Sequence, residues 1–187
     1  MFHNEVFTLE KNDMKIILIG YMGSGKTTIG KKLAEITSME FKDLDTEIEK
    51  DVGLSVDQIF AKKGEIYFRK KEREVLESLL NANNPIILST GGGTPCFGDT
   101  IGFLISQKNT QTIYLKASIN TLTERLFEER NTRPLISHLG NKEELYDFIS
   151  KHLFERSYYY HKASVVLDVN NLSVNEIAEK IKKEISI

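Results

Sequence analysis

Residues 15–30 have the sequence KIILIGYMGSGKTTIG, and this stretch decides the fold. Ile16–Ile19 is a short apolar run rich in β-branched residues, which predicts a buried strand. It leads directly into Gly20–Thr27, which matches the P-loop pattern G-x-x-x-x-G-K-[ST] with an additional glycine at Gly23. A helix is predicted next, because apolar residues then recur at helical spacing. A strand, a glycine loop and a helix therefore follow one another in the order that this motif requires.

The chemistry of this stretch predicts a polyphosphate site. Glycines let the backbone curl so that several N–H groups point inward, and the helix N-terminus adds a partial positive charge at the same place. Lys26 supplies a full charge for the β- and γ-phosphates, and the Thr27 hydroxyl can ligate Mg²⁺. The alternative, an ordinary glycine-rich turn before a helix, does not explain the fixed spacing.

Length and composition are those of one globular domain. The chain has 187 residues, of which 40% are hydrophobic and 28% are charged. The net charge of −2 argues against a nucleic-acid partner held by bulk charge. No apolar run reaches the length of a membrane span. Cys96 is the single cysteine, which excludes an intrachain disulfide and favours a cytoplasmic location.

Short apolar runs alternate with helical patterns along the chain. The predicted strands are Ile16–Ile19, Glu40–Leu44, Pro85–Ser89, Thr112–Leu115 and Val165–Asp168. Capping boxes predict helix starts at Thr46, Ser55 and Ser173. Further helices are expected over 65–80 after an interruption at Gly64, over 100–106, from Ser118 onward, and over 142–160. Five β–α units in series predict a parallel sheet covered by helices, with ligands at the carboxyl ends of the strands.

Polar and glycine residues follow two of these strands. Period-two geometry would send the carboxylates of Asp43 and Asp45 to one side, where Asp43 could hold Mg²⁺ through water and Asp45 could face a second substrate. Gly91–Gly93 follows the third strand, and backbone without side chains lets a ligand come close. Solvated acids and a flexible turn are the alternatives.

Four arginines remain open to two interpretations. Arg69 and Arg156 each lie beside the apolar face of a helix, which is also typical of a solvated arginine with a buried stem. Arg130 and Arg133 lie in a polar break over residues 128–141. Such a break beside a nucleotide site indicates a closing lid that brings positive charge to the transferred phosphoryl group.

Taken together, these residues resemble the shikimate kinase family of small P-loop kinases. The resemblance runs over about residues 14–186 and is carried by Gly20–Gly30, Asp43-Leu44-Asp45, Phe68-Arg69, Ser89–Gly93, Arg133-Pro134 and Arg156–Tyr160. It implies a three-layer α/β/α sandwich around a five-stranded parallel sheet. It also implies phosphoryl transfer from ATP to the 3-hydroxyl of shikimate, with Mg²⁺, in aromatic amino-acid synthesis.

The resemblance also implies roles for individual residues. The nucleotide phosphates would be held by Gly23, Ser24, Gly25, Lys26, Thr27 and Thr28. Thr27 would bind Mg²⁺, with Asp43 in its outer shell, and Arg133 would be the lid arginine on ATP. Shikimate would be bound by Asp45, Arg69, Gly91, Gly92, Gly93 and Arg156, and the segment of about residues 46–69 would be the shikimate-binding region. Lys26, Asp45 and Arg133 would be catalytic, and Asn170 or Asn171, with Asn171 preferred, would contact adenine.

Two other classes of protein share parts of this pattern. One is another small-molecule P-loop kinase, for gluconate or a nucleoside monophosphate, but neither predicts Arg69 together with the triple glycine. The other is a nucleotide-dependent binding protein without turnover, against which the intact Lys26, Thr27, Asp45 and Arg133 argue. Residues 1–13 are expected to form an N-terminal extension before one kinase domain over 14–187, and the protein is expected to be a monomer.

Overall fold

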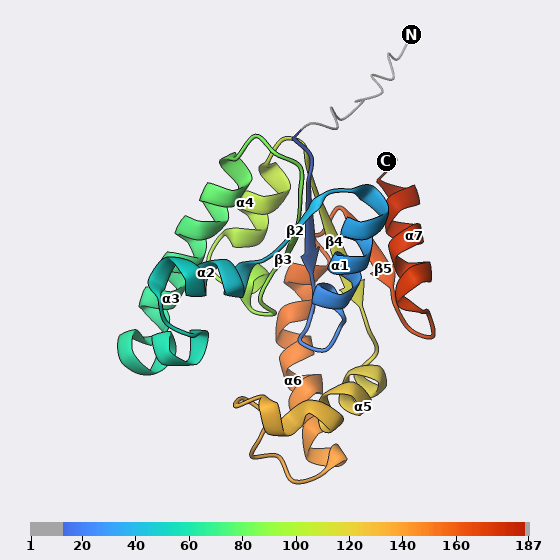
Figure 1. The fold of residues 1–187 in the computed structure, drawn as a ribbon. Helices are drawn as coiled ribbons and strands as arrows, with labels where there is room; N and C mark the ends of the chain where they lie inside the picture. The colour runs from blue at the N-terminus through green and yellow to red at the C-terminus, as the bar shows by residue number, and fades with distance from the viewer. Residues whose placement is uncertain (1–12, 186–187) are drawn as a thin grey trace.

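The computed structural model describes residues 13–185, so the predicted extension lies almost wholly outside the described residues. Five strands form one sheet in the order β2-β3-β1-β4-β5, and every neighbouring pair is parallel (Figure 1). The strands are β1 (Lys15–Ile19), β2 (Glu40–Asp43), β3 (Ile86–Ser89), β4 (Thr110–Lys116) and β5 (Val165–Asp168). The five-stranded parallel sheet predicted from the sequence is therefore confirmed.

Helices cover both faces of this sheet. They are α1 (Lys26–Thr37), α2 (Leu44–Val52), α3 (Val56–Asn81), α4 (Thr100–Ser106), α5 (Ile119–Glu129), α6 (Lys142–Tyr160) and α7 (Val174–Glu184), with short 3₁₀ helices η1 (Thr94–Cys96) and η2 (Arg130–Thr132). Figure 1 shows α1 and α7 together on one face, with α3 and α4 on the other. Right-handed crossovers place α1 opposite α3 and α4, because the chain moves in one direction from β1 to β2 and in the opposite direction afterwards. The last helix, α7, connects no strands and packs beside α1.

The central strand β1 is the core of the sandwich. All five of its residues are buried, as are all four residues of β3 beside it. Helices contribute the rest of the core through residues such as Leu33, Leu76 and Ile149. A strand buried on both faces needs a continuous apolar run, which is the pattern that predicted β1.

The boundary between β2 and α2 differs from the sequence prediction. The strand ends at Asp43, and Leu44 already belongs to α2. The helix starts there because the Asp43 side chain accepts a hydrogen bond from the Asp45 backbone N–H. The predicted capping box at Thr46 is therefore wrong, since a competing N-cap lies three residues earlier.

Other boundaries agree with the sequence. The capping boxes of Ser55 with Gln58 and of Ser173 with Glu176 are both present. Gly64 breaks helical geometry inside α3 with φ 81° and ψ 172°, as predicted. Within residues 13–185, no helix is both long and apolar enough to cross a membrane.

Candidate active site

The register of the sheet brings three strand ends to one edge. Asp43 at the end of β2 lies opposite Ser89 on β3, and Ser89 lies opposite Leu18 on β1. Beyond this edge is a cavity of about 470 Å³. Most of its lining comes from the P-loop and from segments that follow β2 and β3: Met22, Gly23, Gly25, Lys26, Thr27, Thr28, Asp43, Asp45, Ser89, Thr90, Gly91 and Gly92. The predicted site residues of these segments are thus brought together.

The P-loop depends on glycine where it turns most tightly. Gly20 has φ 144°, and a Cβ there would lie 2.9 Å from the Leu115 carbonyl oxygen. Gly25, the N-cap of α1, has φ 97°, a left-handed conformation that side chains rarely adopt. The hydroxyl of Ser24 is buried and has no hydrogen-bond partner among residues 13–185. A buried polar atom of this kind fits a loop that awaits a polar ligand.

Lys26 is held by the P-loop itself. Its ammonium group donates hydrogen bonds to the carbonyl oxygens of Gly20 at 2.9 Å and Tyr21 at 3.0 Å. Burial lowers the pKa of Lys26 to about 8, although the nearby carboxylates of Asp45 and Asp43 act in the opposite direction. The amine is therefore a buried charge that a polyphosphate would stabilise.

Thr27 and Asp43 form the predicted metal position. The Thr27 hydroxyl donates a hydrogen bond to Asp43 Oδ2 at 3.1 Å, and both residues line the cavity. A hydroxyl and a carboxylate beside a phosphate site are hard oxygen donors of the kind that Mg²⁺ prefers. The residues present therefore fit this ion, with the remaining ligands left to phosphate and water.

Asp45 reaches the cavity by a route that the sequence analysis did not foresee. It is not a strand residue alternating with Asp43, because it lies in the first turn of α2. Both carboxylates nevertheless line the same cavity. Burial, followed by the like charges of Asp43 and Glu72, raises the pKa of Asp45 to about 6, with Lys26 acting in the opposite direction. A carboxylate with a raised pKa can accept a proton near neutrality.

The triple glycine is the point at which three parts of the site meet. A Cβ on Gly91 would lie 3.2 Å from Asp45 Oδ1, and a Cβ on Gly92 would lie 3.3 Å from the backbone nitrogen of Met22 in the P-loop. A Cβ on Gly93 would lie 2.9 Å from Nη2 of Arg69. The missing side chains thus let the acid, the phosphate loop and an arginine approach one short turn.

Arg69 is fixed by a buried acid. Its guanidinium donates to Glu72 Oε2 at 2.8 Å, and the other Glu72 oxygen accepts a hydrogen bond from the Thr94 hydroxyl at 2.6 Å. Glu72 and Thr94 are both buried. The Nε of Arg69 is buried without a hydrogen-bond partner among the described residues. The interpretation of Arg69 as a solvated arginine is therefore wrong, because its side chain is only 16% exposed.

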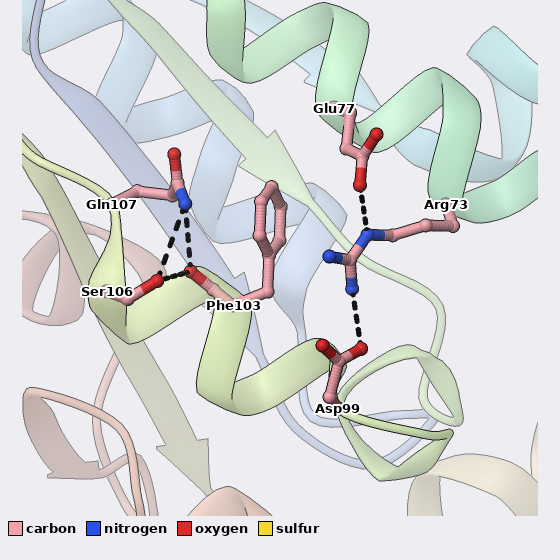
Figure 2. A network of polar contacts seen from close by, with 6 residues as sticks. All are labelled: Arg73, Glu77, Asp99, Phe103, Ser106 and Gln107. Carbon is pink, nitrogen blue, oxygen red and sulfur yellow. Dashed lines mark hydrogen bonds and ion pairs between the residues drawn. The ribbon is translucent and has the colours of Figure 1, made fainter.

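A second network holds α3, which carries Arg69, against the segment that follows the glycine turn. Figure 2 shows Arg73 between Glu77 on its own helix and Asp99, to which it donates a hydrogen bond at 2.9 Å. The Arg73 guanidinium also stacks over the Phe103 ring at 3.8 Å from its centroid. Asp99 immediately precedes α4, so this contact ties α3 to α4 beyond the turn.

Arg156 lies on α6 beside the P-loop. Its guanidinium carbon is 5.7 Å from the centroid of the Tyr21 ring. One turn later, the buried Tyr160 donates a hydrogen bond to the Gly92 carbonyl oxygen at 2.6 Å. Arg156 and Arg69 both influence the pKa of Cys96, which burial raises to about 11. The glycine turn is therefore approached from two helices, by Arg69 of α3 and by Tyr160 of α6.

The two arginines of the predicted lid behave differently. Arg133 lines the cavity and forms an ion pair with Glu129, which also lines it. Arg130 instead stacks on Phe127 and donates to that residue's carbonyl oxygen. The segment is anchored by Ile136, whose side chain is fully buried. Closure of residues 128–141 over a ligand stays a prediction.

The sequence analysis missed one arginine and gave one asparagine a role that the geometry does not support. Arg125 on α5 lines the cavity and donates to the Gly23 carbonyl oxygen at 3.1 Å. Neither Asn170 nor Asn171 is among the described residues that line the cavity, and the side chain of Asn170 accepts hydrogen bonds from Ser118 and Thr121. After β5, the cavity is lined by the apolar residues Leu172, Val174 and Ile177 instead.

These features together define a class of protein. A P-loop with its lysine and threonine, an acid beside a glycine turn, and a separate pair of arginines define a P-loop kinase that phosphorylates a small molecule. The family model for shikimate kinase matches residues 22–186. The chain belongs to the shikimate kinase family.

Individual relatives agree with this assignment. The shikimate kinase of Flavobacterium johnsoniae is 45% identical over 167 residues, which cover 89% of this chain and 96% of that protein. The crystal structure of shikimate kinase from Bacteroides thetaiotaomicron has a TM-score of 0.84 and 31% identity, covering 93% of this chain and 99% of that one. A shikimate kinase from Acinetobacter baumannii in complex with shikimate has a TM-score of 0.80 and 32% identity, covering 94% of each chain.

Proposed function

We propose that this protein transfers the γ-phosphoryl group of ATP to the 3-hydroxyl of shikimate, giving shikimate 3-phosphate and ADP. The observation that carries the proposal is the meeting of Asp45, the P-loop and Arg69 at Gly91–Gly93. A substrate with a carboxylate at one end and hydroxyls at the other would have an arginine, an acid and the phosphate loop within reach of one turn. The product enters chorismate and aromatic amino-acid synthesis.

The nucleotide would lie in the cavity between the P-loop and the start of α7. The phosphates would be held by Gly23–Thr28, with Lys26 exchanging its carbonyl partners for phosphate oxygens. The apolar residues Leu172, Val174 and Ile177, which line the same cavity as Arg125, would accommodate the adenine ring. Mg²⁺ bound by Thr27, with Asp43 in its outer shell, would neutralise charge on the β- and γ-phosphates.

The second substrate would be oriented from both ends. Arg69 and Arg156 would bind the carboxylate, because guanidinium groups pair with carboxylates at two points. Asp45 would orient the attacking hydroxyl and accept its proton as the new O–P bond forms and the bond to the β-phosphate oxygen breaks. Arg133, released from Glu129, would stabilise the negative charge on the transferred group.

A substrate panel tests this function. Purified protein with Mg-ATP is offered shikimate, gluconate, AMP or CMP separately, and release of ADP is measured. We expect turnover with shikimate alone. Turnover with gluconate or a nucleoside monophosphate in its place would reject the proposed substrate while leaving the kinase class intact.

The arginine assignments are tested by Arg69→Lys and Arg156→Lys. Lysine keeps the charge and cannot form the two-point contact. Loss of a charged hydrogen bond costs about 1.5–3 kcal/mol, so shikimate binding measured by calorimetry should weaken at least tenfold. Unchanged affinity in both variants would remove the carboxylate assignment. The monomeric state and the cytoplasmic location stay predictions, which sedimentation and localisation experiments can test.

A further inference from the structure

The P-loop contains one large side chain that points away from the nucleotide cavity. Tyr21 is 1% exposed, and its hydroxyl lies 3.1 Å from Nδ1 of His152 on α6. His152 is itself packed against Phe148, with ring centroids 4.1 Å apart. Sequence reasoning gave Tyr21 and His152 no role, because Tyr21 occupies an unspecified position of the P-loop pattern and the contact spans 131 residues.

His152 precedes Arg156 by one helical turn, so Tyr21 lies against both residues. The Tyr21 ring centroid is 5.7 Å from the Arg156 guanidinium carbon, within the range of a cation–π contact. Within residues 13–185, Arg156 forms no ion pair, whereas Arg69 is paired with Glu72. The two arginines proposed to bind one carboxylate therefore differ in one respect: both lie over aromatic rings, but Arg69 also has an acid partner.

The Tyr21–His152 contact adds no charge beside Arg156. Burial raises the pKa of Tyr21 to about 12, so the hydroxyl is neutral at physiological pH. Burial, together with the positive charge of Arg156, lowers the pKa of His152 below its ordinary value, so the imidazole is neutral as well. An acid at either position would pair with Arg156 and compete with a carboxylate ligand. A neutral pair holds the ring without that competition.

We propose that Tyr21 is a positioning residue for the second substrate: its ring supports the Arg156 guanidinium, and His152 fixes the ring through the hydroxyl. The P-loop then has a second role besides binding phosphates, since one of its side chains orients the arginine that receives the acceptor carboxylate. The inference rests on the carboxylate role proposed for Arg156 above.

The test compares Tyr21→Leu, Tyr21→Phe and Tyr146→Phe by steady-state kinetics. Tyr21→Leu removes the ring and should raise the KM for shikimate by about tenfold. Tyr21→Phe keeps the ring and loses the hydroxyl bond, and should raise that KM by about threefold. The KM for ATP and kcat should stay within about twofold in each variant. The control is Tyr146, which lies on α6 with His152 and Arg156 and is 41% exposed. The kinetics of Tyr146→Phe should match those of the wild type.

A purely structural role would give a different result. Since Tyr21 lies inside the P-loop, a general distortion of the loop would raise the KM for ATP at least as much as that for shikimate. Equal increases in both constants would overturn the proposal, as would an unchanged KM for shikimate in Tyr21→Phe and Tyr21→Leu. If Tyr21→Leu does not fold, the Tyr21→Phe result decides the question alone.

Arg156→Lys separates this inference from the carboxylate assignment. If Tyr21 acts through Arg156, adding Tyr21→Phe to Arg156→Lys should cause no further increase in the KM for shikimate. Full additivity of the two effects would overturn the positioning role. If Arg156→Lys alone leaves the KM for shikimate unchanged, the carboxylate assignment itself fails, and the positioning role fails with it.

Discussion

Gly93→Ala isolates the contact between the glycine turn and Arg69. Gly93 has φ −88° and ψ −18°, a conformation that alanine adopts without strain. The new Cβ would lie 2.9 Å from Arg69 Nη2, whereas comfortable contact needs about 3.5 Å. The guanidinium therefore has to move by about 0.6 Å, the difference between these two separations.

Arg69 cannot make that movement freely. It donates to Glu72 at 2.8 Å, and its guanidinium lies 5.2 Å and 5.3 Å from the ring centroids of Phe68 and Phe97. A 0.6 Å displacement along the hydrogen bond would stretch it to about 3.4 Å, beyond the usual range. The same displacement would misalign the guanidinium with a substrate carboxylate. A charged hydrogen bond contributes about 1.5–3 kcal/mol, so losing about half of a bond at the upper end of this range predicts a roughly tenfold weaker interaction.

The assay is ADP release with shikimate and ATP varied in turn. We expect the KM for shikimate to rise about tenfold in Gly93→Ala while the KM for ATP stays within about twofold. The matched control is Gly102→Ala on α4, where a Cβ would meet no atom within 4 Å. That variant should keep wild-type kinetics and gain about 0.5–1 kcal/mol of stability, because alanine loses less entropy in a helix.

Two results would contradict this reasoning. An unchanged KM for shikimate in Gly93→Ala, together with a raised value in Arg69→Lys, would mean that Arg69 keeps its function after moving away from the turn. Equal increases in both Michaelis constants would mean that the turn itself has deformed.

Three further predictions concern the phosphoryl-transfer residues. Lys26→Ala should abolish turnover while circular dichroism shows an intact fold, and near-wild-type turnover would reject the P-loop assignment. Asp45→Asn should lower kcat far more than it weakens ATP binding. Since the pKa of Asp45 is raised to about 6, kcat/KM of the wild type should fall as the pH falls through 6, and the variant should lack this limb. Because its pKa is raised, protonated Asp45 contributes stability to the fold below about pH 4, and this contribution is lost as the pH rises through 6. Asp45→Asn has no charge to bury, so its Tm at pH 8 should be higher than that of the wild type. Arg133→Ala should reduce kcat more than it raises the KM for ATP, and hydrogen exchange over residues 128–141 should slow when Mg-ADP and shikimate are added; equal exchange in both states would remove the lid role.

Local patterns predicted most of the fold. The bounds of α4, α6 and β5 agree with the approximate bounds predicted from the sequence, and the start of α6 coincides with its Asn141 cap. The start of α2 could not be predicted in this way. Leu44 directly follows the residues of β2, and the start of the helix there depends on the side chain of Asp43.

The parts of the site that lie at the end of a predicted strand could be predicted from the sequence. The P-loop, Asp43 and the triple glycine follow strands directly, and parallel strand ends must share one edge. Arg125 and Tyr21 were not predictable, since their contacts with Gly23 and His152 span 102 and 131 residues and follow from helix packing. The i,i+3 spacing on a helix allows the pairing of Arg69 with Glu72, but the burial of that pair depends on tertiary packing, which spacing does not give.

The buried position of Lys26, against the carbonyl oxygens of Gly20 and Tyr21, links nucleotide affinity to proton uptake. With its pKa at about 8, the amine is neutral in about half of the ligand-free molecules at pH 8. Polyphosphate favours the charged amine, so binding at that pH should draw about half a proton from the buffer. Calorimetric heats should therefore vary with the ionisation enthalpy of the buffer used. Above pH 8 the affinity for ATP should decline by up to about tenfold per pH unit, although the phosphates of ATP no longer titrate there.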